Sequence, residues 1–419
     1  MSNMSSMHSP VCLFIAICAI LCLVDARENQ EKYTTFQCIG GSQVLKTESM
    51  VQASVKVFPL NNPEFRMCLY RNMCLVNGTL TYFKKAGNVP AEYLPEGFGG
   101  NIHHLSYLRG FTMPITTRAG PIPSDLQFHD AKLVFLDSNS WSFNYGHYLH
   151  DNVIPTFTAA KVFNLPITDS QQLFETSCRL FSTLEPAFSD RIVTYNRSMG
   201  SYRQACLHRL NTMWPFFYDR PPIYADDLSS KTVCFKKLIS GQGSTFGLKS
   251  IDLSRAVMYR EFRDYVLDRL ASRDPSFVRD PPQENLILIG LRTVGSAGGS
   301  LINDLCQRAK TGLEGLVDYN KKYKVECFVP SDHGFAQEIM IVRRAKLLIS
   351  VHGTISYMSL FSREGTVQIS VASPKELKEN QMLLYMTHIT ALYLTWDKLQ
   401  QLPGVMEHAL NLAEEFHEA

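Results

Sequence analysis

The sequence lacks an excess of charge of either sign. Its 419 residues include 41 Lys and Arg against 39 Asp and Glu, and it has no long basic or acidic tail. Because nucleic-acid-binding proteins usually carry a basic patch or stripe, the composition argues against nucleic acid as a partner. The apolar share of 45% and the charged share of 19% are typical of a folded globular protein, not a disordered one.

The sequence also lacks a long apolar run. The run from Val11 to Val24 is shorter than the roughly 20 residues of a membrane span. Its length is typical of a signal peptide, and Val24-Asp25-Ala26 fits the small-residue cleavage pattern. An uncleaved anchor is the alternative, because no Lys or Arg precedes the run. Both readings place the rest of the chain in the secretory pathway lumen (endoplasmic reticulum or Golgi) or outside the cell, with membrane contact only through an anchor.

Two domains are expected for a chain of this length. The polar, proline-containing segment 273–283 has no periodicity and predicts a linker. It separates an N-terminal region, 27–272, from a C-terminal domain, 284–419. Residues 1–26 are the signal peptide or anchor.

Cys-x-x-Cys pairs are absent, which argues against a zinc site. Three of the 11 cysteines lie in the apolar run, and the remaining eight are an even number, which predicts disulfides in a lumenal protein. Cys306 and Cys327 are the only cysteines after the linker, so we predict that they pair. The sequons at Asn77 and Asn196 predict glycosylation and fit the same compartment.

Strands and helices are expected to alternate in both regions, after irregular structure over residues 27 to about 125. Strands are predicted at 132–137, 191–195, 232–241, 284–292, 323–329, 346–351, 365–371 and 391–396. Helices are predicted at 146–163, 254–272, 300–310, 332–345, with Asp332 as its cap, 354–361 and the C-terminus. Apolar strands that alternate with helices predict parallel sheets covered on both faces. We therefore expect two Rossmann-like domains facing across a cleft.

Ligands bind beyond the carboxyl ends of the strands in such sheets. Arg292, the Ser331-Asp332-His333 segment and the His352-Gly353 turn follow three predicted strands of the C-terminal domain. A guanidinium fork, a glycine and a helix N-terminus would together suit a diphosphate. The alternative is structural, with Arg292 as a surface ion-pair residue and His352 as a helix cap.

The stretch "WSFNYGHYLHDNVIPTF" (141–157) places His147, His150 and Asp151 just after an apolar strand and before Pro155. A metal site, a catalytic base and a capped structural helix would all use these residue types. In a helix, His147 and Asp151 would be i, i+4 neighbours. A carboxylate beside an imidazole orients the ring and raises its basicity.

Four blocks of the sequence resemble glycosyltransferase family 61. They are the histidine stretch, "VCFKKLISG", "LRT" with the later Asn303, and "RRAKLLISVHGTISYMSLFSREGTVQISV". The resemblance covers roughly 130–397. Within the family, the motifs are most similar to the group of the protein O-mannose β-1,4-N-acetylglucosaminyltransferase and the EGF-domain-specific O-GlcNAc transferase.

The resemblance implies a GT-B fold and inverting transfer of a sugar, of the GlcNAc or xylose type, from a UDP-sugar to a hydroxyl on a protein or glycan. No bound cofactor is implied, and no DxD motif is present to hold a metal. The resemblance assigns donor binding to Arg292, Asn303, His352, Gly353, Thr354 and Ser370. On the acceptor side, His147 or Asp151 is expected to be the base, and His150 an acceptor contact.

Two departures from the family pattern favour a second hypothesis. Ser370 stands where the family has a glutamate suited to the ribose hydroxyls, and the second Arg usual after "RT" is missing. A lumenal pseudoenzyme that binds glycan or protein without transfer would account for both. A metal-dependent hydrolase built on the histidines is a third hypothesis. In a purely structural reading, Asn144 caps the helix and the histidines pair internally with Asp151.

Overall fold

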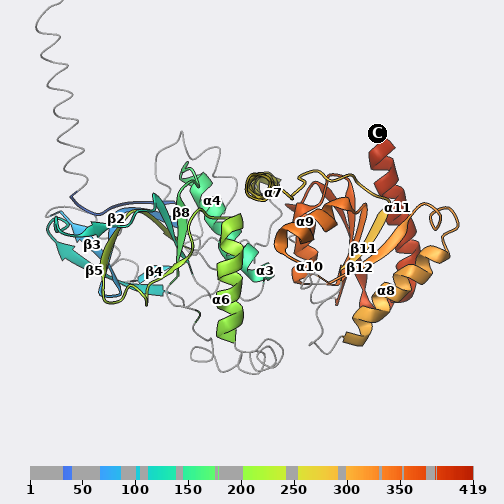
Figure 1. Ribbon diagram of the computed structural model, residues 1–419, viewed down its shortest axis with the longest axis horizontal. Coiled ribbons are helices and arrows are strands. Elements are labelled where there is room, and N and C mark those ends of the chain that lie inside the picture. Colours follow the sequence, from blue (N-terminus) through green and yellow to red (C-terminus); the bar gives the residue numbers. More distant parts are fainter. Residues whose placement is uncertain are drawn as a thin grey trace, which may run out of the picture.

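A computed structural model of the chain contains two β-sheets flanked by helices, which confirms a mixed α/β fold (Figure 1). The structure describes residues 32–39, 67–85, 101–103, 112–137, 145–174, 178, 202–241, 253–290, 299–329, 333–351, 353–373, 383 and 385–418. The signal peptide or anchor, the strand expected at 191–195, Asn144 and Asn196 lie outside these residues.

The second sheet has five strands, all parallel, as the apolar strands predicted. In spatial order they are β12 (Lys324–Phe328), β11 (Leu286–Gly290), β13 (Leu347–Val351), β14 (Thr366–Ala372) and β15 (Ile389–Thr395). Numbered along the chain, this order is 2-1-3-4-5, one of the two common doubly wound arrangements. Its topological switch point lies between β11 and β13.

Helices cover both faces of the second sheet (Figure 1). On the side away from the first sheet are α8 (Gly299–Glu314) and α11 (Leu402–Glu418), which follows the 3-10 helix η12 (Trp396–Gln401). On the side toward it are α9 (Phe335–Arg344), α10 (Thr354–Tyr357) and the 3-10 helix η10 (Met358–Phe361). The Asp332 cap was predicted wrongly. The N-cap of α9 is Gly334, in extended conformation, so the helix begins two residues later than a cap at Asp332 would require; Asp332 itself lies outside the described residues.

The first sheet has a parallel part of four strands. These are β9 (Ile223–Tyr224), β8 (Ser170–Phe174), β7 (Leu133–Asp137) and β10 (Thr232–Gly241). Numbered within this part of the sheet, the order is 3-2-1-4, which is the start of the other common doubly wound order. Here the switch point lies between β7 and β10.

The region before residue 125, expected to be irregular, contributes β1 (Thr35–Ile39), β2 (Met67–Val76), β3 (Thr79–Lys84), β4 (Asn101–His103) and β5 (Thr112–Ala119), followed by β6 (Gln127–Phe128). These strands extend the first sheet, and β2 pairs antiparallel with β10. Asn77 and Gly78 join β2 to β3 with φ of 49° and 75°. Two positive φ values in a two-residue loop define a type I′ hairpin, for which Asn-Gly is the strongest short signal. The expectation of an irregular region was therefore wrong.

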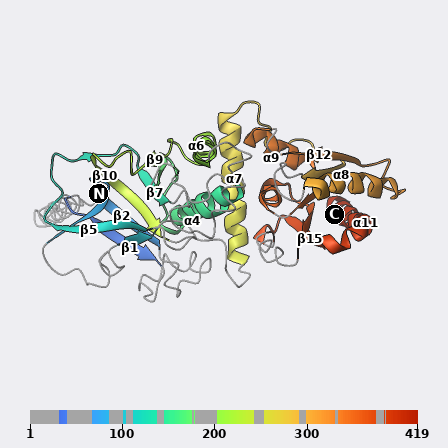
Figure 2. The same ribbon diagram turned by 90° about the horizontal axis from the view of Figure 1, so that it is seen from below.

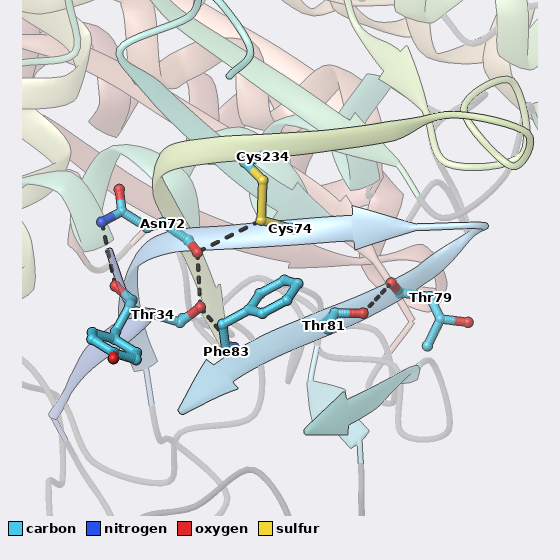
Figure 3. Close-up of a disulfide and its surroundings, with 8 residues drawn as sticks. Thr34, Asn72, Cys74, Thr79, Thr81, Phe83 and Cys234 are labelled. Atoms are coloured by element: carbon cyan, nitrogen blue, oxygen red, sulfur yellow. Dashed lines mark hydrogen bonds between the residues drawn. A yellow bond between two sulfur atoms is a disulfide. The ribbon is translucent and has the colours of Figure 1, made fainter. Parts of the chain in front are cut away.

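A disulfide fixes β2 to the parallel part of the sheet (Figure 3). Cys74 and Cys234 are direct partners across the β2–β10 ladder and are bonded to each other. Beside them, the Thr34 hydroxyl donates to the Asn72 carbonyl at 2.8 Å and accepts from the Phe83 amide at 3.0 Å. These bonds hold the segment before β1 against the edge of the β2–β3 hairpin.

All eight cysteines after the apolar run are paired, as predicted from their even number. The bonds are Cys38–Cys68, Cys74–Cys234, Cys178–Cys206 and Cys306–Cys327. The last one, between α8 and β12, agrees with the prediction. Four disulfides are typical of an oxidising, secretory-type environment. Within the described ranges, no helix is long and apolar enough to span a bilayer.

The helix expected at 146–163 is continuous but not uniform. It consists of α3 (Tyr145–His147), a π-helical turn η5 (Tyr148–Val153) and α4 (Ile154–Val162). Pro155 explains the wider turn, because it has no N–H to bond the carbonyl four residues earlier, and π geometry bonds five residues apart. After α4, Asn164 adopts φ 51°, and the Leu165 amide bonds the Ala160 carbonyl at 2.8 Å, which is a Schellman C-cap.

The other helices in the described part of the first half of the chain are α6 (Tyr202–Met213), the 3-10 helix η8 (Trp214–Phe216) and α7 (Leu253–Arg273). Helix α7 lies between the two sheets (Figure 2). The segment expected to be a linker follows α7, and Arg343 of α9 fixes it by bonds to the Arg279 carbonyl and the Asp280 carboxylate.

Candidate functional site

Three of the predicted site segments follow strands that flank the two switch points: the histidine stretch after β7, Arg292 after β11 and the His352-Gly353 turn after β13. In the second sheet, Gly290 pairs with Ser350 at the ends of β11 and β13, so the chain leaves both strands at one edge. In the first sheet, Phe135 pairs with Ile239, each two residues before its strand ends. Ligands bind at such edges in open α/β sheets. The sequence after β7 leads into α3, and the sequence after β13 leads into α10.

Helix α3 of the first sheet contacts helix α10 of the second. They lie on the facing sides of the two halves (Figure 1). Helix α3 carries His147 and leads into the π turn with His150 and Asp151, whereas α10 starts directly after Gly353. The fold therefore brings the segment predicted for the acceptor next to the turn predicted for the donor. The side chains of the two histidines and Asp151 lie outside the described part of the chain.

Gly353 has a backbone conformation that favours glycine. Its φ is +118°, which residues with a Cβ rarely adopt, and no described atom lies within 4 Å of the position that a Cβ would take. A glycine here allows a ligand to approach the backbone closely. Arg292 and His352 lie outside the described residues, as do the side chains of Asn303 and Thr354, so their donor-binding roles stay predictions.

Ser370 is the predicted ribose contact whose side chain the structure describes. It lies in β14, pairs with Ser350 of β13 and is fully buried, with 0% exposure. The strand continues to Ala372, so Ser370 lies inside the sheet and not at its edge. A hydroxyl in this place is shielded from a ligand at the carboxyl edge.

Phe335, the first residue of α9, joins the two halves of the molecule. Its ring lies 5.2 Å from that of Tyr145 in α3 and 4.9 Å from that of Phe216 in η8, measured between centroids. On the other side it meets Phe361 of η10 edge-on at 5.7 Å. Such aromatic pairs add about 0.5–1.5 kcal/mol each beyond the area they bury. The start of the histidine-carrying helix is thus packed against the second half of the chain.

Three polar groups adjoin this aromatic cluster: Tyr145 of α3, Arg209 of α6 and Glu338 of α9. The Arg209 guanidinium lies 5.9 Å from the centre of the Tyr145 ring. Burial raises the pKa of Glu338 to about 8, although the charge of Arg209 acts in the opposite direction. Burial also raises the pKa of Tyr145 well above its usual value and lowers that of Arg209. The Tyr145 Oη and the Arg209 Nε have no hydrogen-bond partner among the described residues.

A second polar group lies under the π turn. The Asp137 carboxylate, at the end of β7, accepts hydrogen bonds from Asn152 Nδ2 at 2.7 Å and Gln172 Nε2 at 2.9 Å. The Tyr148 hydroxyl donates to Gln172 Oε1 at 2.7 Å. We call these four residues the Asp137 network. Asp137 could have been noticed in the sequence as a carboxylate ending an apolar strand, but its partners come from two other elements.

A pocket in the described structure lies away from the predicted site segments. It has a volume of about 370 Å³ and lies between α8, η12 and α11, lined by residues such as Arg308, Leu316 and Pro403. It contains none of the predicted site residues. The described residues also include no group of three or more His, Cys, Asp or Glu side chains placed to hold a metal.

Comparison with models of known protein families gives no match, and comparison with curated proteins gives none either.

Proposed function

We propose that the protein is an inverting glycosyltransferase with a GT-B arrangement, acting in the secretory pathway lumen. It would move a sugar, of the GlcNAc or xylose type, from a UDP-sugar to a hydroxyl on a protein or glycan. The second sheet would hold the nucleotide through Arg292, Asn303 and the His352-Gly353-Thr354 turn. The first would hold the acceptor through the π-helical segment.

The contact between α3 and α10 is the observation that carries this proposal. An inverting transfer needs a base beside the acceptor hydroxyl at the moment when the sugar carbon is attacked. The base and the donor must therefore come from segments that meet. The segments that resemble family 61 on sequence grounds follow strands at both switch points, and the helices after them touch. His147 or Asp151 would take the proton, and His150 would contact the acceptor.

A pseudoenzyme is the second candidate, and the burial of Ser370 favours it. A serine can make one bond to a ribose hydroxyl but cannot accept two as a carboxylate can, and this serine is inside the sheet. A protein with weak or no donor binding could still hold a glycan or a peptide on the first half of the chain.

The test is calorimetric titration of the purified lumenal chain with a panel of UDP-sugars, followed by hydrolysis and transfer assays with and without a chelator. The glycosyltransferase predicts saturable binding of at least one UDP-sugar and turnover that persists in chelator. Binding of UDP-sugars without hydrolysis or transfer would favour the pseudoenzyme. The absence of any nucleotide binding would contradict the transferase, and turnover abolished by chelator would favour the metal-dependent hydrolase.

A further inference from the structure

The Asp137 network is fully enclosed. The exposed fractions of Asp137, Tyr148, Gln172 and Asn152 are 0%, 0%, 1% and 2%. The two carboxylate oxygens accept from separate side-chain amides, and the amide oxygen of Gln172 accepts from a tyrosine hydroxyl. An enclosed polar group left without a partner is costly, since water cannot replace the lost bond. A rearrangement of these side chains would therefore leave enclosed polar atoms without the partners that they have here.

The network holds the π turn at two places. Tyr148 is the first residue of the turn, and Asn152 is its last but one. His150 and Asp151 lie between these two anchors. The anchors bond to two neighbouring parallel strands, Asp137 in β7 and Gln172 in β8, which pair with each other. The turn is thus fixed to a rigid sheet and not only to its own helix.

We propose that Asp137 and Gln172 are positioning residues that hold the π turn in register and so set where His147, His150 and Asp151 are presented. The proposal rests on the proposed function. A π turn contains one residue more than an α-helical turn allows, and π bulges are frequent at functional sites. If the turn relaxed to α-helical geometry, residues on one side of it would rotate by about 100° relative to the other. The anchors at Tyr148 and Asn152 oppose that rotation.

A reciprocal exchange tests the proposal. In Asp137→Asn, a side-chain amide replaces one carboxylate oxygen, so either Asn152 or Gln172 faces a donor instead of an acceptor. Adding Asn152→Asp restores the pairing, because the amide introduced at position 137 can donate to the new carboxylate and still accept from Gln172. We expect kcat to fall roughly 10- to 100-fold in the single variant, since a misplacement of about 1 Å can cost that much. The double variant should recover most of the lost kcat. The affinity of both variants for the UDP-sugar should stay within about twofold of the wild-type value.

Thr158→Val is the matched control. The Thr158 hydroxyl is buried in α4 and donates to the Ile154 carbonyl at 2.7 Å. Its removal also deletes an enclosed hydrogen bond in the same helix, but beyond the π turn. This variant should melt at a lower temperature than wild type and keep its kcat. If Asp137→Asn behaves in the same way, with lower stability and unchanged kcat, the network is only structural and the proposal is wrong.

Hydrogen exchange separates this proposal from the proposed function. Amides of 148–153 should exchange faster in Asp137→Asn, recover in the double variant and stay slow in Thr158→Val. If the wild type transfers no sugar, the glycosyltransferase proposal fails, while the exchange pattern still shows whether the network fixes the turn. Unchanged exchange of these amides in Asp137→Asn would overturn the proposal that the network positions the π turn. If Asp137→Asn does not fold, Tyr148→Phe removes one terminal bond of the network, and a smaller change in the same direction is expected.

Discussion

Glu338 of α9 and Arg209 of α6 are both half-buried and interact electrostatically, and the positive charge of Arg209 does not offset the desolvation of the carboxyl. The pKa of Glu338 stays at about 8, far above the usual value of about 4.3 for glutamate. The folded protein therefore holds a proton that the unfolded chain releases. Stability from this group is fully present below about pH 4.3 and is lost as the pH rises toward 8.

Glu338→Gln, which cannot ionise, should abolish this loss. The melting temperature of the variant should exceed that of the wild type by an amount that is smallest near pH 4.5 and largest from pH 8 upward. Calorimetry across that range measures the difference. Glu407→Gln, on an exposed position of α11, is the control and should give a constant difference. A constant difference for Glu338→Gln as well would show that the carboxyl is not held in its protonated form.

Phe335 should be essential for joining the two halves of the chain. Phe335→Ala removes a ring that is 7% exposed and packed against Tyr145, Phe216 and Phe361. We expect a loss of about 3–5 kcal/mol in the free energy of unfolding. Phe335→Leu keeps most of the volume and should cost less than about 1.5 kcal/mol. Denaturant unfolding gives both values, and equal effects of the two substitutions would contradict the packing argument.

Replacing glycine by alanine should change the stability in opposite directions at two positions, Gly78 in the Asn77-Gly78 turn and Gly404 near the start of α11. Gly78 has φ +75°, so Gly78→Ala should cost about 1–2 kcal/mol. Gly404 lies in α11 without a positive φ, and no described atom lies within 4 Å of the place that a Cβ would occupy. Gly404→Ala should therefore stabilise by about 0.5 kcal/mol. Thermal unfolding of the two variants tests this. Asn77 is exposed in the turn, and both variants keep its sequon, so glycan occupancy stays comparable.

The disulfide between Cys306 and Cys327 closes a loop with a sequence separation of 21. Replacing both cysteines by alanine should cost about 3 kcal/mol in the chain-entropy description. Unfolding under non-reducing conditions measures the loss. Addition of a reductant should lower the stability of the wild type by more than that of the double variant, because the double variant no longer has this disulfide to lose. Peptide mapping that finds either cysteine free or differently paired would contradict the bond.

The strands of the second sheet could be predicted because their apolar runs are continuous and bounded by polar residues. The strand expected at 346–351 is β13 (Leu347–Val351), and β10 matches its expected limits, 232–241. β13 is buried along its whole length, so its local composition and its final environment agree, whereas β10, in the first sheet, is buried only in part. The hairpin of β2 and β3 carries the Asn77-Gly78 signal, but the Gly- and Pro-rich stretches around it favour irregular structure, which is why the prediction there was wrong.

The sheet edge at which the predicted site segments lie could be predicted from the sequence, but the local geometry of those segments could not. Residues after β11 and β13 were expected at one edge, and the register of the two strands agrees. The π turn was not predictable from helical periodicity, because it depends on Pro155 and on side-chain bonds to β7 and β8, the strands before and after it in the chain. The junction of Arg209 with Glu338 has no sequence signal at all, since two helices on different sheets create it.

Arg292 and the residues of the histidine stretch should affect different steps of the reaction. The diphosphate is charged throughout, so Arg292→Ala should weaken UDP binding by about 1.5–3 kcal/mol, the range of a charged hydrogen bond. The base acts only as the acceptor proton leaves. His147→Ala or Asp151→Ala should therefore keep UDP affinity and lower turnover about 10²–10⁴-fold for the residue that is the base.

Arg308→Ala is the control for Arg292, because Arg308 lies exposed on α8 in an ion pair with Asp304, and its UDP affinity should equal that of the wild type. Each variant must also melt like the wild type, because the structural reading of the histidine stretch predicts destabilisation instead. The two sets of effects should separate, since Arg292 follows a strand of the second sheet and the histidine stretch follows a strand of the first. Folded His147 and Asp151 variants with full turnover would refute the base assignment. An Arg292 variant with unchanged UDP affinity would show that Arg292 does not hold the diphosphate.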